Sequence, residues 1–129
     1  MQRVKTRAQF QAVMAGTTVS RTAHFALHRI ALEFPGPGAK GQQALFAVRE
    51  PWIGAVVPKR WARRAVTRNT LKRQIYTVAQ DLAARLPVAA HVVRLRTGFD
   101  RQQFTSATSV PLKRAVRAEL VQLFGAGEA

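Results

Sequence analysis

The segment from Arg63 to Gln74, RRAVTRNTLKRQ, is rich in arginine and lysine and contains no acidic residue. Guanidinium and ammonium groups at close spacing are suited to binding phosphates. The pattern extends upstream as a ladder of cations at a spacing of four: Arg60, Arg64, Arg68 and Lys72. On a helix, like charges at that spacing repel each other by about 0.2–0.5 kcal/mol per pair. Solvated faces normally mix signs, so this pattern favours a surface that binds a polyanion.

Asn69 stands among these cations and has two interpretations. Its side chain could cap a helix or hydrogen-bond to a neighbouring loop. It could instead orient the arginines, or contact a sugar or a base edge directly. The sequence alone leaves both open.

The whole chain shares this charge imbalance. It carries 21 Lys and Arg against 6 Asp and Glu, a formal net charge of +15 over 129 residues. A compact domain with that excess repels itself unless an anionic partner neutralises it, so we expect binding to nucleic acid, well ahead of an anionic membrane surface. There is no apolar run long enough for a spanning helix, no apolar secretory segment at the N-terminus, and no cysteine. We therefore expect a cytoplasmic protein.

The acidic residues and histidines do not indicate catalysis by the protein itself. The six acids are scattered, whereas a two-metal nuclease needs clustered carboxylates. His24, His28 and His91 fall in predicted strands without cysteine or acidic neighbours in sequence. For His24 and His91 this favours a structural role with local hydrogen bonds. We predict no catalytic residue and no metal site in the protein.

Hydrophobic periodicity predicts the elements that position these residues. A first helix should run from Val4 to Met14, with Thr6 as N-cap, Gln9 completing a capping box, and Gly16 as its stop. A strand should follow around residues 24–32. The runs QALFAVRE and WIGAVVPKR then predict two strands, or one strand bent at Pro51.

The second half of the chain predicts two longer helices around one strand. The first begins near Ala62 and ends at Pro87, with a buried stripe of Leu71, Ile75, Val78, Leu82 and Leu86. Residues 91–96 form the strand. The last helix begins near Pro111 and ends at Gly125.

This order predicts an α+β sandwich in which helices cover a small sheet, formed by a single domain over residues 1–129. Within it, PGPGAKG marks residues 33–43 as a flexible loop.

The segment Gly54–Ile75, GAVVPKRWARRAVTRNTLKRQI, resembles the signature of the protein subunit of bacterial ribonuclease P. That signature has a strand ending in Lys-Lys or Lys-Arg, then Arg-Arg-Ala, then Arg-Asn-x-x-Lys-Arg on a helix. Weaker similarity covers nearly the whole chain. VKTRAQFQAVMAG is similar to the family's first helix, HFALHR to its first strand, HVVRLR to its last strand, and Leu112–Phe124 to its closing helix.

The resemblance implies a fold and two binding surfaces. The fold is an α-β-β-β-α-β-α sandwich with a small mixed sheet and a left-handed β-α-β crossover, against the usual right-handed preference. The segment QALFAVREP and the loop before it suggest an elongated β-hairpin. The residues that match the RNA-subunit-binding surface are Lys59, Arg60, Arg63, Arg64, Arg68, Asn69, Lys72, Arg73 and Tyr76. The residues that match a cleft for the single-stranded 5′ leader of precursor tRNA are Phe10, Met14, Phe25 and His28.

The chain departs from the family pattern at three places. Thr70 stands where arginine is usual, Tyr76 and Thr77 stand where Arg-Glu is usual, and Met14 stands where phenylalanine is common.

The function implied by the resemblance is assistance to an RNA enzyme. The catalytic RNA subunit and its Mg²⁺ ions cut precursor tRNA to give the mature 5′ end, while the protein binds both RNAs. No membrane or small-molecule partner is implied. An alternative is a non-enzymatic RNA-binding protein such as a ribosome-associated module, which fits the charge but leaves the joint PKR, RRA, RN and KR arrangement unexplained. Membrane-surface binding is weaker still, because the basic helix lacks a Trp/Phe-rich apolar face.

Overall fold

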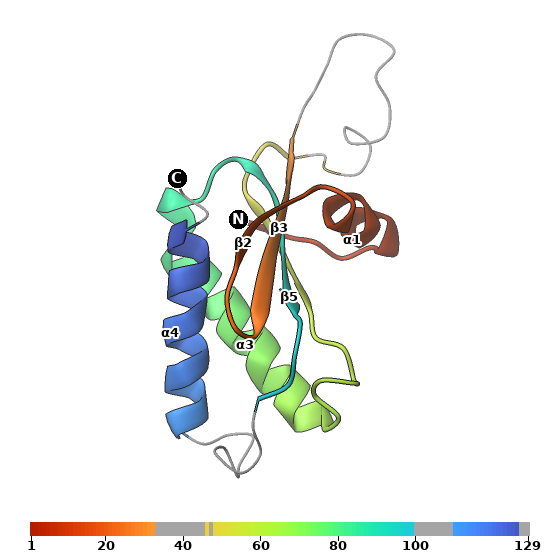
Figure 1. Cartoon of the computed structure of the whole chain (residues 1–129). Coiled ribbons are helices and arrows are strands. Elements are labelled where there is room, and N and C mark those ends of the chain that lie inside the picture. The colour runs from red at the N-terminus through yellow and green to blue at the C-terminus, as the bar shows by residue number, and fades with distance from the viewer. Residues whose placement is uncertain (33–45, 47, 100–109, 127–129) are drawn as a thin grey trace, which may run out of the picture.

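The computed structural model describes residues 1–32, 46, 48–99 and 110–126, which form one mixed sheet with helices on both sides (Figure 1). The strands are β1 (Gln2–Arg3), β2 (Thr17–Arg21), β3 (Phe25–Ala31), β4 (Trp52–Val56) and β5 (Ala89–Leu95). The helices are α1 (Arg7–Met14), α3 (Ala65–Asp81), α4 (Val110–Ala126) and a short 3₁₀ helix, η1 (Ala83–Arg85). An α+β fold was expected and is confirmed.

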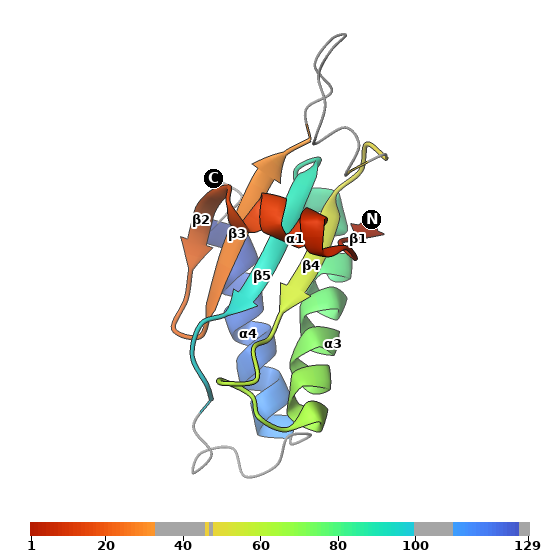
Figure 2. The same cartoon turned by 90° about the vertical axis from the view of Figure 1, so that its right-hand side faces the viewer.

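The strand order across the sheet is β1-β4-β5-β3-β2. β1 pairs with β4 and β4 with β5 in parallel, while β3 pairs antiparallel with both β5 and β2. In Figure 2, β4 and β5 both point downward, β4 lies to the right of β5, and α3 connects them behind the sheet. This connection is left-handed, as the resemblance implied.

The two faces of the sheet are covered unequally. α3 and α4 cover one face, whereas the short helix α1 crosses the other (Figure 2). The larger core lies under α3 and α4 and includes Phe25, Ile53, Leu71, Leu95 and Phe124. A smaller core lies under α1; its buried members include Val4, Val13, Trp52 and Val92.

Helix α1 begins with the capping box that the sequence predicts. The Gln9 amide donates to Thr6 Oγ1 at 3.1 Å, and Gln9 Oε1 accepts from the Thr6 amide at 3.1 Å and from the Lys5 amide at 2.8 Å. The helix starts at Arg7, three residues later than Val4, because the preceding residues run along β4. The Gln2 amide donates to Pro51 O and the Val4 amide to Ile53 O.

Strands β1 and β2 are not predicted by the sequence. β1 has only two residues, and β2 is a mostly polar edge strand whose register shifts between Thr18 and Ser20, so neither shows a regular apolar alternation. HFALHR therefore forms the second strand after α1, and its assignment as the family's first strand is wrong.

Other predicted boundaries also change. α3 ends at Asp81 and η1 then carries the chain to the buried Leu86, so Pro87 does not end the helix. α4 continues past Gly125 to Ala126. Residues 48–50 form a bend instead of a strand. The predicted flexible loop at 33–43 and most of the expected long hairpin lie outside the described residues.

Gly54 on β4 sets how closely α1 approaches the sheet. A Cβ atom there would lie 2.7 Å from Phe10 Cε1 and 2.9 Å from Val4 Cβ. We predict that Gly54→Ala lowers the free energy of unfolding by about 1–3 kcal/mol, because α1 must move outward. Urea unfolding measures this effect.

Gly125→Ala is the matched control, since a Cβ at Gly125 would meet nothing within 4 Å. Its effect should stay within about 0.5 kcal/mol. Equal stability of the two variants would contradict the close approach at Gly54.

Candidate nucleic-acid interface

The first candidate surface lies at the N-terminal half of α3 and the turn before it. We call it the basic surface; its exposed members are Lys59, Arg60, Arg63, Arg64, Asn69, Lys72 and Arg73. It faces solvent because the opposite stripe of α3, formed by Leu71, Ile75, Val78 and Ala79, is buried against the sheet and α4. The first turn of α3 contains no acid. These predicted cations are therefore exposed along the N-terminal half of α3 and the turn before it.

The cation ladder is shorter than the sequence predicts. α3 begins at Ala65 with Arg64 as N-cap, so Arg60 lies before the helix, where its guanidinium is 5.4 Å from the Trp61 ring centroid. Arg64, Arg68 and Lys72 remain at helical spacing. Asn69 is an exposed residue within the helix, which excludes the N-cap interpretation of its role.

Arg68 is half-buried and has a structural role that the sequence did not indicate. Its Nη1 donates to Ala62 O at 3.0 Å and to Arg63 O at 2.8 Å, holding the turn that enters α3. Thr70, where the family usually has arginine, donates to Val66 O at 2.8 Å within its own helix.

Tyr76 extends the basic surface toward β1. The Arg3 guanidinium lies 4.2 Å from the Tyr76 ring centroid, a cation–π contact. Arg3, Asn69, Lys72 and Tyr76 are among the residues that line a pocket of about 540 Å³ between β1 and α3. Arg3 is thus an additional candidate that sequence reasoning missed, because its contact with Tyr76 depends on the unpredicted strand β1.

The second candidate surface is the face of the sheet that α1 partly covers, here called the α1-side surface. Phe10 and Met14 lie half-buried on α1, and His28 is buried on β3. Phe25 does not belong to it. Phe25 is fully buried in the larger core, because residues three apart on a strand point to opposite faces. Its assignment to the leader cleft is therefore wrong.

His28 is held between two side chains on this surface. Arg94 Nε, which can only donate, lies 3.2 Å from His28 Nε2, so that nitrogen is unprotonated. The proton must then sit on Nδ1, which donates to Thr18 Oγ1 at 3.1 Å. Burial, followed by the charges of Arg94 and Arg21, lowers the pKa of His28. The imidazole is therefore neutral.

His91 is also held by an arginine and a second hydrogen-bond partner, but on the face of the sheet away from α1. Arg29 Nε donates to His91 Nδ1 at 3.2 Å, and His91 Nε2 donates to Pro87 O at 3.2 Å. Burial lowers the pKa of His91 to about 4. These local bonds match the structural role that the sequence favoured.

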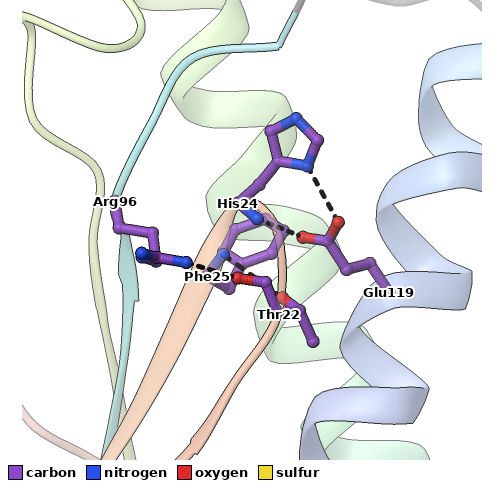
Figure 3. A network of polar contacts seen from close by, with 5 residues as sticks. All are labelled: Thr22, His24, Phe25, Arg96 and Glu119. Carbon is purple, nitrogen blue, oxygen red and sulfur yellow. Dashed lines mark hydrogen bonds and ion pairs between the residues drawn. The ribbon is translucent and has the colours of Figure 1, made fainter.

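His24 has an acidic partner that its sequence neighbourhood did not reveal. Its Nδ1 lies 2.8 Å from Glu119 Oε1, and its backbone amide donates to Glu119 Oε2 at 3.1 Å (Figure 3). The Phe99 ring stacks on the His24 ring, with 3.9 Å between the ring centroids. Arg96 Nη1 donates to Thr22 O at 2.9 Å. These contacts tie the β2–β3 turn to α4 and to the end of β5.

Neither a metal centre nor a membrane span emerges from the described residues. Within them no group of three or more His, Cys, Asp or Glu side chains could hold a metal ion. No helix in the same part of the chain is long and apolar enough to cross a membrane.

Arg68→Ala should lower the free energy of unfolding by about 1 kcal/mol, because two carbonyl groups at the start of α3 lose their donor. Denaturant unfolding measures this loss. Arg73→Ala serves as control, since Arg73 is exposed on the same helix, and should change stability by less than about 0.5 kcal/mol. Equal effects would show that the Arg68 bonds do not support the turn.

Stability should also depend on His91. Its pKa in the folded chain is about 4 against an ordinary 6.5, so between these values the unfolded chain takes up a proton that the folded chain does not. The free energy of unfolding should therefore fall as pH drops from 6.5 to 4, by up to about 3 kcal/mol. His91→Asn should make this fall smaller. The same pH dependence in both proteins would contradict a neutral buried His91.

Comparisons with known proteins agree with this arrangement. The family model for Ribonuclease P matches residues 1–119. The ribonuclease P protein component of Bordetella parapertussis is 36% identical over 113 residues, covering 88% of this chain and 80% of that protein. The protein of the same name from Ralstonia pickettii is 33% identical over 119 residues, which cover 90% of this chain and 71% of that protein. The RNase P protein of Staphylococcus aureus has a similar fold, with a TM-score of 0.68 and 17% identity, over 97% of this chain and 94% of that one. The RNase P protein of Thermotoga maritima also has a similar fold, with a TM-score of 0.64 and 18% identity, over 95% of this chain and 94% of that one. The chain therefore belongs to the ribonuclease P protein family.

Proposed function

We propose that this protein is the non-catalytic subunit of a cytoplasmic ribonuclease P, which removes the 5′ leader from precursor tRNA. The observation that carries the proposal is the basic surface. Its seven members are exposed together, while Glu50, Asp81 and Glu119 are bonded elsewhere, to the Met1 amino group, Arg117 and His24. Within the part of the chain that the structure describes, no carboxylate forms an ion pair with this surface, which suits it to a phosphate backbone.

The partner of the basic surface would be the catalytic RNA subunit. Lys72 and Arg73 would contact phosphates, and the exposed amide of Asn69 is free to reach a sugar or base edge. Each phosphate neutralised releases counterions, so this binding should weaken with salt. Arg68 contributes charge, but its position is already fixed by the turn before α3.

The partner of the α1-side surface would be the leader of precursor tRNA. Phe10 and Met14 are partly exposed there, and an aromatic ring is a suitable platform for an unstacked base. His28 is mostly buried, 5% exposed, so its part is to hold a neighbour in position.

Hydrolysis would be performed by the RNA subunit with Mg²⁺, which supplies the Lewis acid for phosphodiester cleavage. The described residues of the protein offer no group of ligands that fits this ion. The protein would instead screen repulsion between the two RNAs and hold the leader, which lowers the Mg²⁺ concentration that cleavage requires.

Reconstitution tests the proposal. The folded protein, added to a bacterial ribonuclease P RNA, should allow cleavage of precursor tRNA at Mg²⁺ concentrations where the RNA alone is inactive. Affinity for the precursor should rise over the first few leader nucleotides. A folded protein that gives no stimulation, and that co-purifies with ribosomal RNA, would favour the ribosome-associated alternative.

A further inference from the structure

Two arginines occupy one row across the α1-side surface. Arg21 on β2 pairs with Ala26 on β3, and Ala26 pairs with Arg94 on β5. Directly paired residues on neighbouring strands project to the same face. That face is the one under α1, because Val92, two residues before Arg94 on β5, packs in the smaller core. Two cations therefore flank a buried alanine on the face of the sheet that α1 crosses.

Arg94 is held by one edge of its guanidinium. Its Nε donates to His28 Nε2, while its two Nη groups bond to no protein atom among the described residues. An arginine fixed in this way presents the two Nη groups as a fork, the geometry that binds a phosphate through two hydrogen bonds. Arg94 is half-buried, so the fork is still reachable from solvent.

His28 supports this orientation because it is neutral. Thr18 Oγ1 accepts from Nδ1 and fixes the ring, which leaves Nε2 as an acceptor for Arg94. A carboxylate in that place would neutralise Arg94, whereas an imidazole holds it and leaves the positive charge available. The arrangement thus orients a cation without cancelling it.

Phe10 lies close to this row. Its ring packs against Gly54, and Gly54 pairs with Val92, two residues along β5 from Arg94. Two residues of a strand span about 7 Å, so a ring and a cationic fork are neighbours on one surface. This combination suits single-stranded RNA, in which a base can leave the stack while the phosphate beside it is bound.

We infer that Arg21 and Arg94 bind backbone phosphates of the single-stranded 5′ leader, with Arg94 oriented by His28 and Thr18. The inference rests on the proposed function and adds to it the cations of the leader site. Arg94 and Arg21 contact the RNA, and His28 is a positioning residue.

The test uses the reconstituted holoenzyme and precursor tRNA. Arg94→Gln and Arg21→Gln should each weaken binding of a leader-bearing precursor about ten-fold, because each removes a charge-assisted contact. Binding of tRNA without a leader should not change. Arg114→Gln is the control, since it removes the same charge from an exposed position on α4, across the sheet.

Neutral methylphosphonate linkages, placed one at a time in the leader, identify the bound phosphate. One linkage should weaken wild-type binding about ten-fold, and Arg94→Gln should be insensitive to that same linkage. If Arg94→Gln does not fold, the same linkage scan with Arg21→Gln tests the inference. Arg21 is exposed on the edge strand, so its substitution should not prevent folding.

The inference is overturned if both variants match Arg114→Gln, or if they weaken tRNA with and without a leader equally. Failure of the proposed function gives a different result, because the wild-type holoenzyme would then show neither cleavage nor any dependence on leader length.

Discussion

The shortage of carboxylates determines how this protein holds its arginines. With 21 Lys and Arg against 6 Asp and Glu, most cations cannot be paired with an acid. The structure uses neutral acceptors instead. Arg68 and Arg96 donate to backbone carbonyl groups, and Arg29 and Arg94 donate to the imidazoles of His91 and His28. These bonds fix the side chains and leave their charge in place, which is what binding to a polyanion requires.

The unequal covering of the sheet separates the two proposed surfaces. α3 and α4 cover one face of the sheet, so the basic surface lies on the outer side of α3 and in the turn before it. α1 is eight residues long and covers part of the other face. The strand alternation then decides which side chains are available there: His28 and Arg94 lie on the α1 side, whereas Phe25 and His91 lie on the other.

The sequence predicts the features that depend on neighbouring residues. The capping box of Thr6 and Gln9 and the apolar strand β5 are local patterns, and both are confirmed. The predicted buried stripe is confirmed within α3 for Leu71, Ile75 and Val78, whereas Leu82 is a half-buried C-cap and Leu86 lies after η1. The family resemblance adds the crossover handedness, which general packing rules would have reversed. The exposed cations of α3 face solvent because the buried apolar stripe lies on the opposite side of the helix.

The errors and omissions concern pairings between distant parts of the chain. His24 meets Glu119 across 95 positions, and Arg94 meets His28 across 66, so neither contact can be read from local spacing. β2 was missed because an edge strand with a bulge lacks regular alternation. Phe25 was misplaced because its residue type, without the register of β3, does not reveal which face it joins.

The central claim is that the exposed cations of α3 bind the phosphate backbone of the RNA subunit, and the salt dependence of that binding tests it most directly. The logarithm of the affinity should fall linearly with the logarithm of salt concentration. Arg73→Ala should weaken binding by roughly 1–3 kcal/mol and reduce the slope by about one unit or less, while Arg114→Gln leaves both unchanged. A slope for Arg73→Ala equal to that of the wild type would contradict the claim.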